Sequence, residues 1–202
     1  NQNYTFDAVL YATGRKANTA NIGLEHTDIV TNERGAIVVN DTCESSVPGV
    51  YAVGDVNGGP QFTYVSLDDF RIVFGTLTGN GQYTLKDRKN IPYTTFLTPP
   101  LSRVGLTEED AINQGYTVKT KEMLVATMPR AHVNDYLKGA FKIVVDADND
   151  LILGATLYSQ GAEELINLIK MAMDNNIPYT YFKNQIFTHP TMAENLNDLC
   201  NF

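Results

Sequence analysis

The 202 residues, 43% of them hydrophobic and 19% charged, have the composition of a globular protein with one or two hydrophobic cores. A net charge of −8 argues against a nucleic-acid partner, because such binders neutralise phosphates with clustered Lys and Arg. No apolar run approaches the roughly 20 residues that cross a bilayer, and no signal peptide opens the chain. We therefore expect no membrane partner and a cytoplasmic location.

The first part of the chain predicts short strands followed by a helix. The apolar run at residues 6–12 predicts a buried strand that starts almost at residue 1, where there is no initiator Met, so we expect the chain to be a piece of a longer protein. Residues 36–39 and 49–53 predict two more strands. Residues 64–77 predict a helix that ends at Gly79.

A polar stretch at residues 81–90, placed just before Pro92, predicts a domain boundary. We therefore expect one domain over residues 1–89 and a second over residues 90–202.

The second part begins with residues 93–97 and 103–106, which predict a strand with a bend because two prolines interrupt the pairing between them. Thr107 and Asp110 have the spacing of a capping box, so a short helix should start there. Residues 118–128 predict a further strand.

Residues 140–146 and 151–158 predict two strands joined by a hairpin turn. The strongest helix signal lies at residues 163–175, where apolar side chains cover more than half of the circumference. Such a helix is either a simple core helix or one that also packs against a second subunit, and the pattern leaves both open.

Two glycine-containing segments follow predicted strands. Thr13, Gly14 and Arg15 come after the first strand, where a glycine lets backbone approach a ligand; an ordinary exit from a strand would look the same. Gly54 and Asp55 end the strand at 49–53, and an acid at that place can accept hydrogen bonds from a sugar or ribityl hydroxyl.

The helix after Asp55 starts near Thr63, and its free N–H groups would favour negative charge on a ligand beyond them. The alternative is a solvated loop aspartate followed by a capped helix.

The third segment is His189 with Glu194 five residues later. A histidine is the natural acid/base near pH 7, and the carboxylate could fix its tautomer and orientation. Alternatively, Glu194 closes a capping box with Thr191 at the start of a last helix over residues 191–199. Spacing alone favours this second interpretation.

Taken together, these segments resemble the pyridine nucleotide-disulfide oxidoreductases, the flavoprotein family of glutathione reductase, dihydrolipoamide dehydrogenase and mercuric reductase. The resemblance covers nearly the whole chain. It rests on A-T-G-R at 12–15, Y-A-V-G-D at 51–55, V-G-L-T-E at 104–108, R-A with G-A-F-K-I over 130–143, and H-P-T-x-x-E at 189–194. One departure is Ala17, which stands where the family usually has proline.

The resemblance implies an α/β segment of an FAD/NAD(P)-binding domain followed by an α+β dimerisation domain, an antiparallel sheet with helices. It implies FAD and NAD(P)H as cofactors, with Asp55 on the ribityl chain, and a homodimer in which His189 acts as acid/base beside the flavin of the other subunit. Glu194 would orient that histidine. A small-molecule or small-protein disulfide or thiol would be the substrate.

The family's remaining motifs do not occur in these residues: a G-x-G-x-x-G for the FAD pyrophosphate, a C-x-x-x-x-C redox pair and a second glycine motif. The cysteines, Cys43 and Cys200, are far apart and have no metal-ligand spacing, so we expect no metal site. We expect the intact parent to be an enzyme, and this chain alone to be inactive and to bind FAD weakly or not at all. Two alternatives stay open: an oligomerisation module only, or a transhydrogenase-like family flavoprotein that lacks the redox disulfide.

Overall fold

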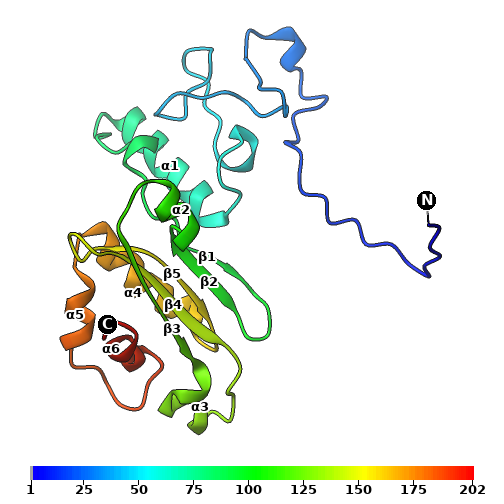
Figure 1. The fold of residues 1–202 in the computed structure, drawn as a ribbon. Helices are drawn as coiled ribbons and strands as arrows, with labels where there is room; N and C mark the ends of the chain where they lie inside the picture. Colours follow the sequence, from blue (N-terminus) through cyan, green and yellow to red (C-terminus); the bar gives the residue numbers. More distant parts are fainter. Residues whose placement is uncertain (1) are drawn as a thin grey trace. The chain divides into compact units, whose positions relative to one another are not determined.

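The computed structural model describes residues 2–202 and divides into two compact units, one ending at Asp87 and the other spanning Arg88–Phe202. The elements of both are traced by colour along the chain in Figure 1. Within residues 2–202, every helix falls short of the length and apolarity that a bilayer crossing needs.

The first unit is built mainly of loops and one long helix, α1 (Thr63–Thr78). Its other helical segments are single 3-10 turns at Leu24–His26, Gly54–Asn57 and Leu85–Asp87. The predicted end of α1 at Gly79 is confirmed, because this glycine adopts φ 75° and its N–H donates back to Thr76 O at 3.3 Å.

The three strands predicted in this unit do not form. Residues 6–12 are exposed and find no pairing partner among residues 2–202, and a strand needs a neighbour to satisfy its backbone groups. Residues 36–39 and 49–53 make only isolated bridges, such as Val39 with Ser45 and Tyr51 with Glu44. The apolar pattern therefore indicated a tendency to be buried. It did not indicate that these residues pair with a neighbouring strand.

The second unit is organised around one antiparallel sheet of five strands in the order β1-β2-β5-β4-β3, which confirms the antiparallel sheet predicted for this part of the chain. The strands are β1 (Tyr93–Thr95), β2 (Leu101–Gly105), β3 (Val118–Leu124), β4 (Ala140–Asp146) and β5 (Ile152–Tyr158). Sequence neighbours β4 and β5 form the predicted hairpin.

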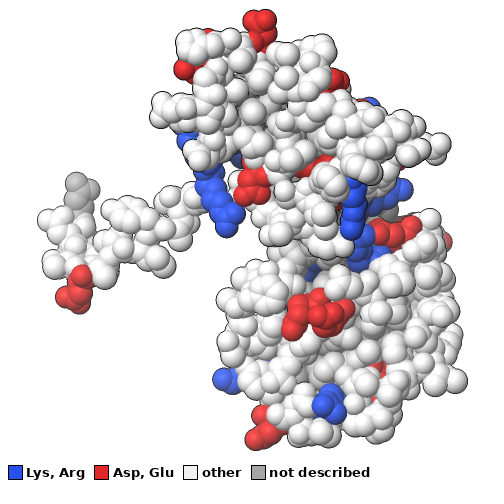
Figure 2. Space-filling model, turned by 180° about the vertical axis from the view of Figure 1, so that it is seen from behind, with Lys and Arg blue, Asp and Glu red and all other residues white. Residues whose placement is uncertain are grey.

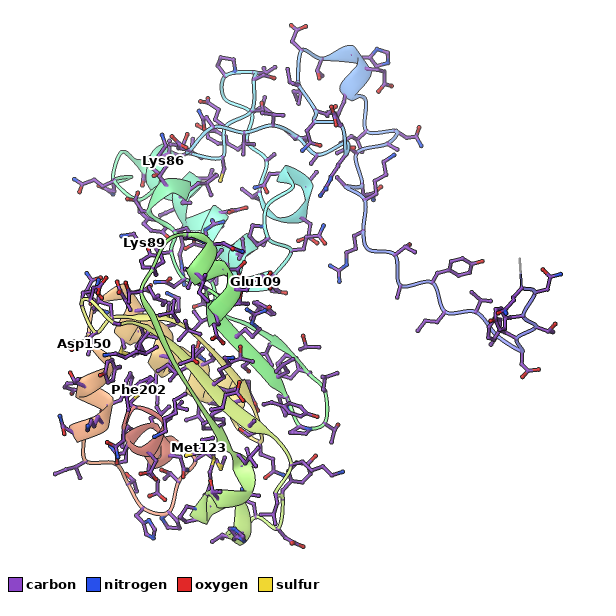
Figure 3. The ribbon with its side chains drawn as sticks, in the orientation of Figure 1. Lys86, Lys89, Glu109, Met123, Asp150 and Phe202 are labelled. Atoms are coloured by element: carbon purple, nitrogen blue, oxygen red, sulfur yellow. The ribbon has the colours of Figure 1, made fainter. Side chains whose placement is uncertain are left out.

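Helices cover one face of this sheet and enclose the hydrophobic core (Figure 1). The helices on this face are α3 (Pro129–Val133), α4 (Ala162–Asp174), α5 (Tyr179–Asn184) and α6 (Leu196–Leu199), whereas α2 (Glu108–Asn113) contacts the opposite face. Helix α4 packs on β2 and β5, and α6 packs on β3 and β4. Met123 of β3, labelled in Figure 3, packs against the same core, and the Phe202 ring lies edge-on to Tyr179 at 4.9 Å.

The opposite face of the sheet carries a polar row that runs across the strands. Arg103 and Lys142 both lie opposite Thr156, and Glu122 lies opposite Lys142. The Lys142 ammonium lies 2.7 Å from Glu108 Oε2 and 3.0 Å from Glu122 Oε1, and these hydrogen bonds raise the Lys142 pKa. Lys142 thereby ties the first turn of α2 to the sheet.

Several elements of this unit differ from their predictions. Residues 93–97 and 103–106 are not one bent strand: the two prolines reverse the chain, and β1 pairs antiparallel with β2. The strand predicted at 118–128 ends at Leu124 and continues as a 3-10 turn. The last helix, predicted over 191–199, is a 3-10 turn at Ala193–Asn195 followed by the single turn α6. Helices α3 and α5 were not predicted because each is too short for a clear period.

Candidate functional site

The predicted site residues fall into two groups, one in each unit. Thr13, Gly14, Arg15, Gly54, Asp55 and Thr63 lie in the first unit, and His189 and Glu194 lie in the second. Each group has its own geometry.

Gly54 and Asp55 begin a 3-10 turn, Gly54–Asn57, that packs directly against α1. Gly54 adopts φ 74°, and a Cβ there would lie 2.7 Å from Ser66 Oγ, so no larger residue fits without a shift. The Gly54 N–H donates to Asp69 Oδ2 at 2.7 Å. Asp55 follows with a half-exposed carboxylate, which is therefore available to a ligand.

The structure brings Arg15 to Asp55, which joins two segments that are forty residues apart. Arg15 Nη1 donates to Asp55 Oδ2 at 3.4 Å, and both side chains are more than half exposed. An ion pair this exposed stabilises the structure by about 0–1 kcal/mol. The contact therefore shows that Arg15 and Asp55 are close, but it does not hold either side chain in one position. Thr13 and Gly14 lie next to Arg15 in extended, exposed chain, and Gly14 has φ 95°.

Helix α1 begins at Thr63, as predicted, and its first turn has no side-chain cap. The N-cap residue is Phe62, whose carbonyl accepts from Val65 and Ser66. The first N–H groups of a helix have no acceptor within the helix, and its N-terminus carries partial positive charge. The exposed start of α1 can therefore receive an acceptor or a negative charge from a ligand.

His189 and Glu194 are in direct contact in the second unit. His189 Nδ1 lies 2.9 Å from Glu194 Oε2; the imidazole is 73% exposed, whereas the Glu194 side chain is only 15% exposed. This geometry suits an Nδ1–H that donates to the carboxylate, a tautomer assigned from the contact. It leaves Nε2 to take or give a proton at the surface.

The competing capping-box interpretation is half correct. The Glu194 N–H donates to Thr191 Oγ1 at 3.2 Å, as in a capping box, and the Thr191 hydroxyl donates to Thr188 O at 2.7 Å. The Glu194 carboxylate, however, faces His189, and its second oxygen Oε1 is buried without a hydrogen-bond partner. One residue thus closes a turn through its backbone and orients the histidine through its side chain.

Two asparagines that sequence reasoning missed hold this turn in place. Buried Asn195 donates to Met192 O at 3.0 Å and to Thr191 O at 3.2 Å. Asn197 donates to Phe182 O at 2.6 Å and to Gln185 O at 3.0 Å, which fixes the chain that leads to His189. The available signal was their position close after the glutamate, at one and three residues from it.

Neither cysteine is an accessible thiolate. Cys43 and Cys200 are both fully buried. Burial raises the pKa of the Cys200 thiol to about 12, against an opposing effect of the Lys121 ammonium. Across residues 2–202 the structure holds no group of His, Cys, Asp and Glu arranged to bind a metal ion.

Acidic residues outnumber basic ones in this chain, with 23 Asp and Glu against 15 Lys and Arg. On the face drawn in Figure 2, acidic and basic side chains are interspersed among a larger area of uncharged residues. With a net charge of −8, this distribution suits a small ligand held by a few local groups better than a polyanion.

Two family models match this chain. The model described as the dimerisation domain of the pyridine nucleotide-disulphide oxidoreductases matches residues 91–200, and the model described as pyridine nucleotide-disulphide oxidoreductase matches residues 1–69.

Curated relatives match along almost the whole chain. A probable pyridine nucleotide-disulfide oxidoreductase, RclA of Escherichia coli (strain K12), is 48% identical over 96% of this chain and 44% of its own length. A mercuric reductase of Staphylococcus aureus is 35% identical over 94% of this chain and 35% of its own length. A dihydrolipoyl dehydrogenase of Thermus scotoductus is 34% identical over 94% of the chain and 41% of its own length. The chain thus spans less than half the length of these relatives.

Solved structures agree. The structure described as the HOCl-induced flavoprotein disulfide reductase RclA from Escherichia coli superimposes with a TM-score of 0.90 and 47% identity, over 94% of this chain and 43% of the other. LpdA from Mycobacterium tuberculosis gives a TM-score of 0.82 at 22% identity, over 92% of this chain and 40% of the other, which shows a shared fold.

Proposed function

The chain belongs to the pyridine nucleotide-disulphide oxidoreductase family, and we propose that in the whole protein it completes one side of an FAD site and supplies the acid/base of a flavin-dependent disulfide or thiol oxidoreductase. The observation that carries this proposal is the 2.9 Å contact between His189 Nδ1 and Glu194 Oε2, with the opposite side of the imidazole exposed.

The residues of the first unit fit one side of a flavin cofactor. Half-exposed Asp55 can accept a hydrogen bond from a ribityl hydroxyl, and Gly54 keeps the turn close to α1 without a side chain in the way. The start of α1 at Thr63 can stabilise negative charge that builds up on the ring. Arg15, Thr13 and Gly14 border the same turn through the Arg15–Asp55 contact. FAD, when bound, would carry electrons from NAD(P)H to the substrate.

His189 would hold and move the proton that accompanies thiol chemistry. Its Nε2 side faces outward, so the reacting sulfur atoms must be presented to it, in a homodimer by the partner subunit. Glu194 keeps the ring in one tautomer and supports the imidazolium. The substrate class is a small-molecule or small-protein disulfide or thiol.

We assign residues 1–89 to the nicotinamide and FAD-binding region and residues 90–202 to the dimerisation domain, and we place the parent protein in the cytoplasm. The matches to residues 1–69 and 91–200 support this assignment. The helix-covered sheet of the second unit supports a role in dimer formation, since it folds around its own core and still exposes apolar side chains on α4.

The test measures the two half-reactions of the whole protein separately by stopped flow. His189→Ala should slow reaction with the thiol or disulfide substrate by about 10²–10⁴, the usual contribution of a positioned acid/base. Reduction of the flavin by NAD(P)H should hold its rate, because hydride transfer to the ring takes no proton from this histidine. Glu194→Gln should give a smaller loss in the same step.

His132→Ala is the matched control. His132 is another exposed histidine of the same unit, with Nε2 2.8 Å from Ala126 O, and its loss should leave both half-reactions unchanged. Equal slowing of both half-reactions by His189→Ala, or of neither, would overturn the acid/base role. A parent that shows no thiol half-reaction at all would instead be a flavoprotein of the transhydrogenase-like kind.

A further inference from the structure

Asp69 is a buried carboxylate for which the proposed chemistry has no direct use. It lies on α1 and is only 1% exposed, although an aspartate is costly to bury unless its charge is compensated. Its Oδ2 accepts two hydrogen bonds, from the Gly54 N–H at 2.7 Å and from Asn57 Nδ2 at 2.9 Å. Both donors belong to the turn that carries Asp55.

Asn57 extends this contact to three separate parts of the unit. Besides Asp69, its Nδ2 reaches Ala52 O at 3.3 Å, and its Oδ1 accepts from the Gly59 N–H at 3.0 Å. One side chain therefore joins the segment before the turn, the segment after it and the helix beneath it. Hydrogen bonds to an ionised partner are stronger than neutral ones, so the bond from Asn57 to Asp69 is the one that fixes the Asn57 side chain most firmly.

The backbone of Asp55 is consequently held on both sides. The residue before it is fixed by the Asp69 bond and by close packing, since a Cβ on Gly54 would meet Ser66 Oγ at 2.7 Å. On the other side, the Asp55 carbonyl accepts from the Gly58 N–H at 3.2 Å. Arg15 cannot fix the position of Asp55 in this way, because both side chains of the 3.4 Å contact are exposed and solvent screens their interaction.

We propose that Asp69 and Asn57 are positioning residues for the flavin site: together they fix the turn so that the Asp55 carboxylate points outward, ready to bind the ribityl chain. This inference rests on the proposed function, in which Asp55 binds FAD. Neither residue needs to touch the cofactor. Their effect passes through Asp55, which distinguishes positioning from a general contribution to the stability of the unit.

The test is a double-mutant cycle on the whole protein, in which FAD affinity is measured by quenching of flavin fluorescence after the cofactor has been removed. Asp55→Ala should weaken FAD binding by about 10-fold or more through loss of its hydrogen bond to the ribityl chain. Asp69→Ala should weaken FAD binding to a similar extent through loss of the buried hydrogen bonds that fix the turn. The double variant should be within about 2-fold of the weaker single variant, because residues that act as one unit are not additive. At saturating FAD, Asp69→Ala should also give the altered visible circular dichroism of Asp55→Ala.

Asp69→Asn retains an oxygen that can accept from the turn, so it should restore much of the affinity and the spectrum lost in Asp69→Ala. Asp68→Asn is the control, with the same change of charge one residue earlier on α1, where Asp68 contacts the Tyr83 hydroxyl instead. It should bind FAD like the wild type. If Asp69→Ala does not fold, Asn57→Ala with Asp55→Ala forms the same cycle.

The outcomes separate the two hypotheses. Asp69→Ala with unchanged FAD affinity, or losses that multiply with Asp55→Ala, would overturn the positioning role while Asp55 keeps its own. An Asp55→Ala variant that binds FAD normally would overturn the proposed role of Asp55, and the positioning role with it.

Discussion

The two units differ in how far they bury the apolar side chains of their main helices. On α4, Leu165, Ile166, Ile169 and Ala172 are buried against the sheet. On α1, the larger apolar side chains are mostly exposed, from 41% to 69%, namely Tyr64, Leu67, Phe70, Phe74 and Leu77. An apolar stripe of this kind normally marks a contact surface. The second unit thus encodes its own core, whereas α1 needs cover that the first unit does not itself supply.

This contrast fits a division of labour. The second unit holds the turn of His189 and Glu194 against its own core, because Phe187, Met192 and Ala193 pack on that core and Asn197 donates to Phe182 O. In the proposed function, the first unit contributes a turn and a helix start to the FAD site, and local hydrogen bonds such as those of Asp69 hold that turn. Rigid elements give the more precise site, so the acid/base pair should be the less easily disturbed of the two.

Matched isoleucine truncations test the contrast with the largest expected effect. Ile169 on α4 and Ile72 on α1 are both essentially unexposed. Ile169→Ala should lower the free energy of unfolding by about 4 kcal/mol, near the upper end for such changes, because sheet and helices enclose the cavity on all sides. Ile72→Ala should cost about 2 kcal/mol, since the looser first unit can collapse around it. Urea unfolding of the whole protein gives both values; equal losses would contradict the comparison.

The exposed side of α4 gives the next largest effect. Leu168 and Met171 are three residues apart on one helix face and are 37% and 59% exposed. If this face packs against a second subunit, Met171→Asp should weaken the dimer by about 10-fold or more without changing the unfolding of the monomer. Sedimentation at several protein concentrations measures it. A Met171→Asp dimer of normal affinity would place the interface elsewhere.

The labelling rates of the two cysteine thiols measure how often each unit opens locally. Both thiols are fully buried, so a thiol reagent reaches them only when the structure opens locally. We expect Cys43, in the first unit, to be labelled faster at pH 8 than Cys200, and mass spectrometry of peptides reads both. Cys200→Ser and Cys43→Ser identify each signal. Faster labelling of Cys200 would reverse the proposed order of stability.

The raised pKa of Cys200 adds a pH dependence with a defined sign. The thiol ionises near 9.0 when unfolded and at about 12 in the folded chain, so the unfolded state loses its proton first. Stability should therefore fall as the pH rises from about 9 toward 12. Cys200→Ala should flatten this fall, which thermal unfolding between these pH values would detect.

Sequence patterns predicted the second unit better than the first, for a physical reason. Residues 140–146 and 151–158 are two largely apolar runs joined by a short polar turn, so the local pattern agrees with the strand pairing that forms. Residues 6–12 have an equally apolar pattern, but residues 2–202 contain no strand that pairs with them, and the pattern alone does not show whether such a partner exists. The prolines at 99 and 100 were recognised as an interruption, but the sequence did not show that the chain reverses there so that β1 pairs with β2.

The candidate sites show the same limit at the level of side chains. Spacing placed Glu194 near both Thr191 and His189, and only the structure shows that its backbone serves one and its carboxylate the other. Asp69 gave no signal, because an aspartate that follows Asp68 on a helix looks like a second solvent-facing residue. Its bonds to Gly54 and Asn57 come from segments that meet only after folding.

The smallest predicted effect compares the starts of two helices. Helix α2 has a closed first turn, since Thr107 Oγ1 accepts from the Asp110 N–H at 2.9 Å and Asp110 Oδ2 accepts from the Thr107 N–H at 3.2 Å. Thr107→Ala should cost about 1 kcal/mol, the usual loss for a Thr N-cap. At the uncapped start of α1, Thr63→Ala should change the free energy of unfolding by less than about 0.5 kcal/mol.

The pH dependence of this cap follows from Asp110. Hydrogen bonds from the Thr107 hydroxyl, and then from its backbone N–H, lower the Asp110 pKa below its ordinary 3.8. A carboxyl whose pKa is lowered by folding stabilises the protein above its unfolded value and loses that contribution as the pH falls through its folded value. The difference in the free energy of unfolding between wild type and Asp110→Asn should therefore be largest at pH 7 and should shrink below about pH 3.8. A difference that stayed constant down to pH 2 would mean that the charge of Asp110 plays no part in closing the turn.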